Sequence, residues 1–495
     1  MITRKITTLV LSFSFSIVGM GAKAQTQKGV DIDGETSGDR SGSAVSMPDA
    51  NTVAIGAPKN DGNGGNAGQV RIYEWSGSSW TQKGADLDGE AAGDLFGSSV
   101  SMPDANTVAV GAPENDGNGT VAGHVRVFEW NGTVWSQKGS DIDGDVPTQT
   151  FGDLFGSSVS MPTANTVAVG APWNAANGIW TGLVRIFDWD GTAWTQRGLD
   201  IHDGIATLSG IRVCMPDVNT VAIASQGGSS NAGHVRIFTW DGTAWAQKGN
   251  NIVGETGGDQ SGNSISMPDA NTIAIGTTDN DGVAPDAGHV RIFTWDGTAW
   301  TQKGSDIDGE AQGDKSGVSA SMGDANTIAI GASLNDDNGS QSGHVRIYNW
   351  NGTDWVRSGS DIDGEAANDQ SGYAVSMPDA NTVAIGAIQN DGGGNEAGHV
   401  RIYTVDNGVS VKETAFIQNI QAYPNPTSGV LEVQLGHKYP LLNVSLKTIN
   451  GSLVRHYTFK NSDTFTIDME GPAGVYFLQI ANERNHQQTF KVVKH

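Results

Sequence analysis

Closely spaced carboxylates are the residues of this sequence most suited to chemistry. The stretch DLDGEAAGD places Asp86, Asp88, Glu90 and Asp94 within nine residues, and related acidic sets occur in other repeats. Oxygens at alternate loop positions can surround a hard cation such as Ca²⁺, which takes about six to eight of them, although the glycine comes too early for an EF-hand loop. The alternative is a turn whose aspartates bond backbone amides or arginines. Ca²⁺ is therefore the one cofactor that the sequence suggests.

The acidic stretches belong to a unit of about 55 residues that occurs seven times. The landmark D-[IL]-x-G, or a degenerate form of it, starts at Asp31, Asp86, Asp141, Asp200, Asn251, Asp306 and Asp361. In the second unit, strands are predicted at 97–102, 107–113, 124–130 and 134–140, because each of these stretches is rich in Val, Ile or aromatic residues between turn residues. Four antiparallel strands per unit predict one blade of a β-propeller.

The two ends of the repeat array predict a closed ring. The seventh unit ends at Val405 without its fourth strand, while Thr26 to Ile32 carry the sequence of that strand ahead of the first unit. We expect this N-terminal strand to complete the last blade, so that no long edge stays exposed. The predicted fold is all-β: a seven-bladed propeller at 25–405, a linker at 406–421 and a small β-sandwich at 422–495.

The repeats resemble the FG-GAP repeats of integrin-α-type β-propellers. Phe96-Gly97 and Phe155-Gly156 match the FG element, and "GAP" at 111–113 matches the rest of the motif. The resemblance implies a propeller that presents its loops to protein or glycan ligands. The calcium loop of that family, DxDxDG between the first two strands, is replaced here by MPDANT with the single carboxylate Asp104. The metal site of the family is therefore not carried over.

Residues that recur in every blade are expected to serve the scaffold. Arginine holds the same place in the third strand of all seven units, which predicts a scaffold ion pair. Twelve of the 14 tryptophans form six pairs around a predicted hairpin turn, which favours packing over a ring of sugar-stacking platforms. The single cysteine, Cys214, is expected to be buried and inert. Because catalysis needs an asymmetric set of acid, base or nucleophile, the sequence does not predict an enzyme.

Units three and four depart from the repeat. Trp173 and Trp180 replace polar loop residues, and His202 and Arg212 appear in the next linker. A unique site in a symmetric array would lie where the symmetry breaks, so these four are the candidate ligand-binding residues. The alternative is drift in a decayed repeat.

Both ends of the chain resemble export signals. Residues 1–24 have the charged, apolar and small-residue order of a signal peptide, with cleavage expected after Ala24. Residues 422–495 resemble the C-terminal sorting domain, type A, of the type IX secretion system, with the motif Tyr423, Pro424, Asn425, Pro426 at the start and GVYFLQI near the end. The resemblance implies the type IX machinery as a partner, and release or attachment at the outer cell surface.

The composition of the chain excludes some classes of binding partner. The chain has 54 acidic and 29 basic residues, a net charge of −25, which repels nucleic acid and anionic lipid. No segment after the first 24 residues has the roughly 18 apolar residues of a transmembrane helix. We expect a monomeric, secreted or surface-bound propeller that binds or adheres without catalysis. A structural surface-layer protein and a calcium-stabilised lectin are the alternatives.

Overall fold

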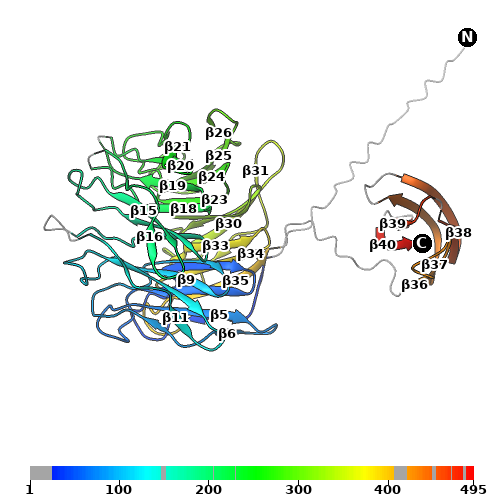
Figure 1. The fold of residues 1–495 in the computed structure, drawn as a ribbon, viewed down its shortest axis with the longest axis horizontal. Helices are drawn as coiled ribbons and strands as arrows, with labels where there is room; N and C mark the ends of the chain where they lie inside the picture. Colours follow the sequence, from blue (N-terminus) through cyan, green and yellow to red (C-terminus); the bar gives the residue numbers. More distant parts are fainter. Residues whose placement is uncertain are drawn as a thin grey trace, which may run out of the picture. The chain divides into compact units, whose positions relative to one another are not determined.

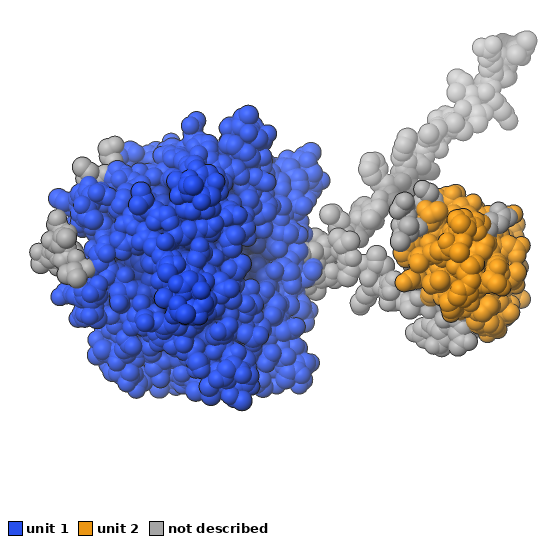
Figure 2. Space-filling model, viewed as in Figure 1, with its two compact units in different colours: residues 1–407 blue, residues 408–495 orange. Residues whose placement is uncertain are grey.

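The computed structural model describes residues 25–145, 152–204, 206–228, 230–405, 421–448, 453–469, 471–482 and 487–495. The predicted signal peptide and nearly all of the predicted linker lie outside these residues. The chain forms two compact units, residues 1–407 and 408–495 (Figure 2). Every regular element in the described ranges is a β-strand (Figure 1). No described helix is long and apolar enough to cross a membrane.

The first unit consists of seven blades with four strand positions each, numbered from the centre of the ring outward. The first strands are β3 (Ala44–Asp49), β8 (Ser99–Asp104), β13 (Ser158–Thr163), β18 (Arg212–Asp217), β23 (Ser264–Asp269), β28 (Ser319–Asp324) and β33 (Ser371–Asp379). The second strands are β4 (Thr52–Ala57), β9 (Thr107–Ala112), β14 (Thr166–Ala171), β19 (Thr220–Ser225), β24 (Thr272–Thr277), β29 (Thr327–Ala332) and β34 (Thr382–Ala387). The third strands are β5 (Gln69–Trp75), β10 (His124–Trp130), β15 (Leu183–Trp189), β20 (His234–Trp240), β25 (His289–Trp295), β30 (His344–Trp350) and β35 (His399–Val405).

The fourth position holds two short strands that both pair with the third strand. In blades one to six these are β6 (Trp80–Gln82) with β7 (Leu87–Asp88), β11 (Trp135–Gln137) with β12 (Ile142–Asp143), β16 (Trp194–Gln196) with β17 (Ile201–His202), β21 (Trp245–Gln247) with β22 (Ile252–Val253), β26 (Trp300–Gln302) with β27 (Ile307–Asp308), and β31 (Trp355–Arg357) with β32 (Ile362–Asp363). The sequence predicted one unbroken strand at 134–140. It is interrupted because Gly139 has a positive φ of 82°, and the D-I-x-G landmark is the second half of the strand. The first strand of blade two likewise begins at Ser99, after Gly97 with φ 91°.

An N-terminal strand closes the ring, as the sequence predicted. β1 (Gln25–Gln27) and β2 (Ile32–Asp33) pair antiparallel with β35, so that Thr26 lies opposite Thr404 and Ile32 opposite Val400. The first strands contact one another in cyclic order, and β33 of blade seven contacts β3 of blade one. Blade seven therefore takes its fourth strand from the other end of the propeller sequence.

The hydrophobic core of the propeller lies between the blades. Each of seven clusters of buried side chains in the described residues combines two neighbouring blades; one joins Val70 and Ile72 of blade one to Val108 and Val110 of blade two. Hydrogen bonds also link neighbouring first strands, as where the backbone N–H of Met102 donates to Ser46 Oγ at 2.9 Å. The propeller therefore depends on the contacts between blades for its stability.

The strand directions give the propeller two different faces. We call the turn face the side that carries the turns between first and second strands and between third and fourth strands. We call the loop face the side that carries the loops between second and third strands and the linkers into the next blade. In blade two, residues 105–106 and 131–134 are on the turn face, and residues 113–123 are on the loop face.

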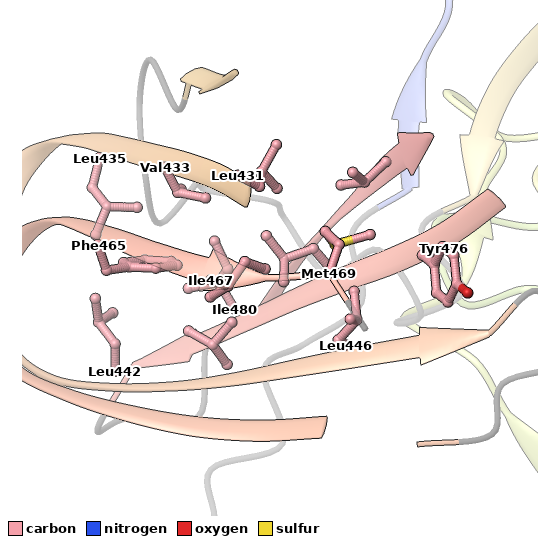
Figure 3. Packing of buried hydrophobic residues seen from close by; sticks show 13 residues of the cluster. Leu431, Val433, Leu435, Leu442, Leu446, Phe465, Ile467, Met469, Tyr476 and Ile480 are labelled. Carbon is pink, nitrogen blue, oxygen red and sulfur yellow. The ribbon is translucent and has the colours of Figure 1, made fainter. Parts of the chain in front are cut away.

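The second unit is a five-stranded sheet that folds over on itself. Its strands are β36 (Gln421–Tyr423), β37 (Val430–Thr448), β38 (Leu453–Asp468), β39 (Gly474–Asn482) and β40 (Gln487–Lys494). The register between β37 and β38 shifts after Gln434. Side chains from both halves of β37, such as Leu431 and Leu446, share one core with Phe465 and Ile480 (Figure 3). This is the packing expected of a small β-sandwich.

Candidate functional site

The four carboxylates of the acidic stretch in the first linker have different surroundings. Asp86 accepts a hydrogen bond from Gln82 Nε2 at 2.6 Å. Asp94 is buried, and its Oδ2 accepts the backbone N–H of Ala91 at 3.0 Å and Asn115 Nδ2 at 3.0 Å. Asp88 and Glu90 are exposed. In the described residues, the four carboxylates do not converge on one point; only Glu90 belongs to a cluster with metal-binding geometry.

The repeated arginines bind carboxylates, which confirms the predicted scaffold ion pair. Arg126 Nη1 lies 3.6 Å from Glu90 Oε1, and Nη2 donates to the carbonyl of Asp88 at 2.6 Å. In every blade, the arginine pairs with a carboxylate of the linker that precedes that blade. The pairs are Arg71–Glu35, Arg126–Glu90, Arg185–Asp145, Arg236–Asp203, Arg291–Glu255, Arg346–Glu310 and Arg401–Glu365. The arginines thereby join each blade to the one before it.

Among the described residues, four clusters of one histidine with carboxylates lie beneath the loop face. They are Asp31–Asp33–His399, Glu90–His124–Asp141, Glu255–His289–Asp306 and Glu310–Asp337–His344–Asp361. Burial, with help from the neighbouring arginine, lowers the pKa of His124, His289 and His399 to about 4, so these rings are neutral at pH 7. A neutral imidazole with neighbouring carboxylates could hold a borderline cation such as Zn²⁺. In three of the clusters, however, the scaffold arginine already pairs with a carboxylate of the cluster, namely Glu90, Glu255 or Glu310. Ca²⁺ would find too few oxygens here.

The paired tryptophans hold neighbouring blades together on the turn face. Lys248 Nζ, from blade four, lies 5.2 Å from the ring centroids of both Trp295 and Trp300 of blade five, and bonds the carbonyl of Ala270 at 2.7 Å. In return Trp300 Nε1 donates to the carbonyl of Lys248 at 2.9 Å. We call this arrangement a latch. The cations and tryptophan pairs of the six latches are Lys28 with Trp75/Trp80, Lys83 with Trp130/Trp135, Lys138 with Trp189/Trp194, Arg197 with Trp240/Trp245, Lys248 with Trp295/Trp300 and Lys303 with Trp350/Trp355.

The remaining two tryptophans lie on the loop face, in the loop between β14 and β15 of blade three. Trp173 is 39% exposed and Trp180 is 42% exposed, and Ile179 between them is 57% exposed. The backbone N–H of Trp173 donates to the carbonyl of Asp153, as that of Lys59 donates to Asp39 in blade one, so Trp173 holds the position of Lys59. The three apolar side chains thus face solvent on one loop.

His202 and Arg212 lie at different places from each other. His202 is in β17, where its carbonyl accepts Arg236 Nη1 at 2.9 Å and its ring Nε2 lies 3.9 Å from Asp200 Oδ2. Arg212 is the first residue of β18, the innermost strand of blade four. It lines a central cavity of about 510 Å³, formed mainly by the first strands of all seven blades. Trp173, Trp180 and His202 are not among the described residues that line this cavity.

Sequence reasoning missed two features of this central cavity. It placed Arg212 in a linker, although alignment of the repeats sets Arg212 at the position of Ser99 and Ser264 in the innermost strand. It also overlooked Tyr373, which lines the same cavity from blade seven. Cys214, two residues further along β18, replaces the serine that bonds the next blade and accepts the backbone N–H of Met267. Burial raises the pKa of its thiol to about 11, consistent with an inert group.

The predicted sorting motif begins the second unit and joins its first and last strands. Tyr423 ends β36, and its hydroxyl lies 3.2 Å from Glu432 Oε1. Asn425 Nδ2 donates to the carbonyl of Lys491 at 2.9 Å, and Asn425 Oδ1 accepts the backbone N–H of Val493 at 2.9 Å. The side-chain amide of Asn425 thus bonds the backbone of β40 as a neighbouring strand would.

Comparison with known families agrees with this architecture. Residues 85–128 match the FG-GAP repeat, and residues 421–495 match the secretion system C-terminal sorting domain. The chain therefore combines a β-propeller, in which residues 85–128 match the FG-GAP repeat, with a C-terminal sorting domain of the type IX secretion system. The sorting domain addresses it for secretion by that system, to the cell surface or the medium.

Several solved structures are similar to this chain at low identity and low TM-score. A candidate 6-phosphogluconolactonase from Bacteroides uniformis is 10% identical, with a TM-score of 0.46 over 65% of this chain and 85% of that one. The β-propeller domain of the Trilobed protease from Pyrococcus furiosus is 9% identical, with a TM-score of 0.39 over 69% and 90%. The GH74 xyloglucanase from Xanthomonas campestris is 12% identical, with a TM-score of 0.42 over 95% and 74%. Likenesses of this size say nothing about activity. None of the curated proteins matches the chain in sequence.

Proposed function

We propose that this secreted propeller is a non-enzymatic binding or adhesion module that engages a protein or glycan ligand through its loop face. The observation that carries the proposal is the exposure of Trp173, Ile179 and Trp180 on one loop of blade three. Aromatic and aliphatic side chains of this kind supply most of the contact energy in protein and sugar recognition. An exposed group of them on a secreted acidic protein is typical of a binding surface.

The distribution of the repeated polar residues supports binding rather than catalysis. The seven repeated arginines are paired with linker carboxylates, and the buried histidines are neutral and enclosed. The residues that break the repeat include Trp173 and Trp180, which can contact a ligand but cannot transfer a proton. We therefore assign recognition to the loop of blade three and no reaction to the propeller.

A pair of double variants tests this function. The full secreted protein carrying Trp173→Ala and Trp180→Ala should bind glycan arrays or cell-surface protein extracts at least about tenfold more weakly, because two aromatic contacts are lost. Val134→Ala with Val356→Ala is the matched control, since both valines are exposed and Val134 lies in a hairpin turn of the opposite face, while Val356 lies two residues after another such turn, in β31. Both double variants should melt at the wild-type temperature. Equal binding by the tryptophan variant and the wild type would contradict the proposal.

A further inference from the structure

The central cavity is positively charged in a strongly acidic protein. Its lining includes Arg40, Lys59 and Arg212, and no Asp or Glu among the described residues. The whole chain carries a net charge of −25, so acidic side chains would be the common finding at any solvent-filled surface. The cavity therefore has a local electrostatic character opposite to that of the chain around it.

Arg212 and Lys59 are the cations of this cavity for which the described residues offer no carboxylate at ion-pair distance. Arg40 pairs with Glu396 at 3.2 Å, and the seven third-strand arginines all pair with carboxylates. The Arg212 guanidinium instead donates from Nη1 to the carbonyl of its neighbour Ile211 at 2.8 Å. Among the described residues, no carboxylate lies within ion-pair distance of it. Four of its five N–H donors are thus left for water or a ligand.

The other blades show that an arginine is not needed here for folding. The equivalent residue is Ser or Ala in the six remaining blades, namely Ala44, Ser99, Ser158, Ser264, Ser319 and Ala374. Ser99 and Ser264 use this position to bond the carbonyl of a glycine in the next blade, at 2.8 Å in both cases. Blade four gives up that contact for a long, solvent-exposed cation at the central cavity.

The surroundings of Arg212 suit a carboxylate. A guanidinium offers a planar pair of N–H donors that matches a carboxylate in a bidentate arrangement. Tyr373, from blade seven, interacts electrostatically with Arg212 and supplies a phenol hydroxyl in the same cavity. The volume of about 510 Å³ is that of a site for a small organic molecule. The acidic field of the chain disfavours multiply charged anions, which favours a monocarboxylate over a phosphate.

We propose that the central cavity binds the carboxylate group of a small organic ligand through Arg212, with Tyr373 as a second donor. The site goes beyond the proposed function, because it does not involve Trp173 or Trp180. Two common sources present a single carboxylate in this form, an acidic sugar and the C-terminus of a short peptide, and the experiment distinguishes them.

The experiment compares charged probes with their neutral counterparts on the full protein by titration calorimetry. One arm uses galacturonate against galactose, and the other uses N-acetyl-alanyl-alanine against its amide. At least one carboxylate should bind in the millimolar range or tighter, and its neutral counterpart should not bind. Arg212→Ser, which copies blade two, should weaken that binding about ten- to hundredfold with no loss of Tm. Tyr373→Phe should weaken it less.

Two further variants make the outcome unambiguous. Arg212→Lys keeps the charge without the planar pair of donors, so its binding should lie between wild type and Arg212→Ser. Lys59→Ser, at the rim of the same cavity, should change binding little. The proposal is overturned if neither carboxylate binds, if acid and neutral probes bind equally, or if binding survives Arg212→Ser or is abolished by Lys59→Ser. Loss of glycan or protein binding in the blade-three double variant would leave this titration unchanged.

Discussion

The two faces of the propeller use tryptophan in opposite ways. On the turn face, twelve tryptophans recur at fixed positions, and each pair is covered by a cation of the preceding blade. On the loop face, Trp173 and Trp180 occur once each and are exposed to solvent. The tryptophans that repeat in this molecule pack against the neighbouring blade, whereas the two that break the repeat are partly exposed to solvent. The face on which an aromatic residue lies therefore decides how its substitution should act.

Loss of the closing strand should have the largest effect, because it opens the ring that both faces share. A propeller that begins at Gly34, without β1 and β2, loses the ladder to β35 and the burial of Ile32. Backbone hydrogen bonds at about 1 kcal/mol each and one buried Ile at about 2 kcal/mol put the loss on the order of 5–10 kcal/mol. Thermal unfolding followed by circular dichroism should show a lower and broader transition.

Removal of the second unit is the matched control for that truncation. A chain that ends at Asn407 should keep the melting temperature of the propeller, because residues 408–495 form a separate compact unit. If the chain beginning at Gly34 melted like the chain beginning at Gln25, the closure would contribute no stability.

The pH dependence of stability should reveal the buried histidines beneath the loop face. His124, His289 and His399 titrate near pH 4 in the folded protein and near 6.5 when unfolded. Between these values the unfolded chain binds protons that the folded chain does not. The free energy of unfolding should therefore fall as the pH falls from about 6.5 to 4, by on the order of 5 kcal/mol in total.

A triple substitution isolates this histidine contribution. His124→Gln, His289→Gln and His399→Gln copy blade one, where Gln69 holds the same position and donates to Glu35 at 3.2 Å. Urea unfolding at several pH values should show a flatter profile for the triple variant than for the wild type. Parallel profiles would mean that these histidines are not held neutral.

A third comparison substitutes one tryptophan on each face. Trp300→Ala removes the rings that Lys248 and Trp295 contact and the Nε1 donor to blade four, so it should cost about 3 kcal/mol. Trp173→Ala removes an exposed side chain and should change stability by less than about 0.5 kcal/mol. Chemical unfolding measures both. Equal losses would mean that Trp173 is also part of the scaffold, and the contrast between the faces would disappear.

The regular features of the repeat could be predicted from the sequence, but the residues that each acidic side chain contacts could not. The blade count, the closing strand and the scaffold role of the arginines follow from spacing and alternation alone. The acidic stretch looked like one cluster because its residues are adjacent in sequence. In the folded chain, strand β7 ends at Asp88 and the turn after it directs Asp94 inward to Asn115. Glu90 binds Arg126, which lies 36 residues away in sequence.

The central position of Arg212 shows a second limit of sequence reasoning. Sequence reasoning places Arg212 in a divergent linker, although the alignment of Cys214 with Ser101 already sets Arg212 at the position of Ser99 in the first strand. Only the ring brings Arg212 and Tyr373, from blades four and seven, into one cavity. Aligning the repeats position by position identifies Arg212 as a departure from Ser or Ala, and Tyr373 as an aromatic residue where the other blades have Ser, Ile, Asn or Val.

The last predicted effect concerns the seam between blades six and seven, the one junction between blades that has no latch in the described residues. Here Val405 and Gln25 hold the positions of the tryptophan pair, and Ser358 holds that of the lysine. Gln25 Nε2 donates to the carbonyls of Ser358 and Ser360, both at 3.0 Å, as a tryptophan Nε1 does in a latch.

Gln25→Ala should therefore cost about 1 kcal/mol, the value of a partly exposed hydrogen-bonded amide, and less than Trp300→Ala. Gln27→Ala is the matched control two residues along the same strand, because its side chain bonds Asp31 within its own segment and not the neighbouring blade. Chemical unfolding of the two variants at one pH measures the difference. A loss for Gln25→Ala as large as that for Trp300→Ala would show that this seam is as strong as a latch, and that the closing strand is held by its first side chain as much as by its backbone ladder. No difference between Gln25→Ala and Gln27→Ala would leave the backbone ladder to β35 and the burial of Ile32 as the contacts that close the ring.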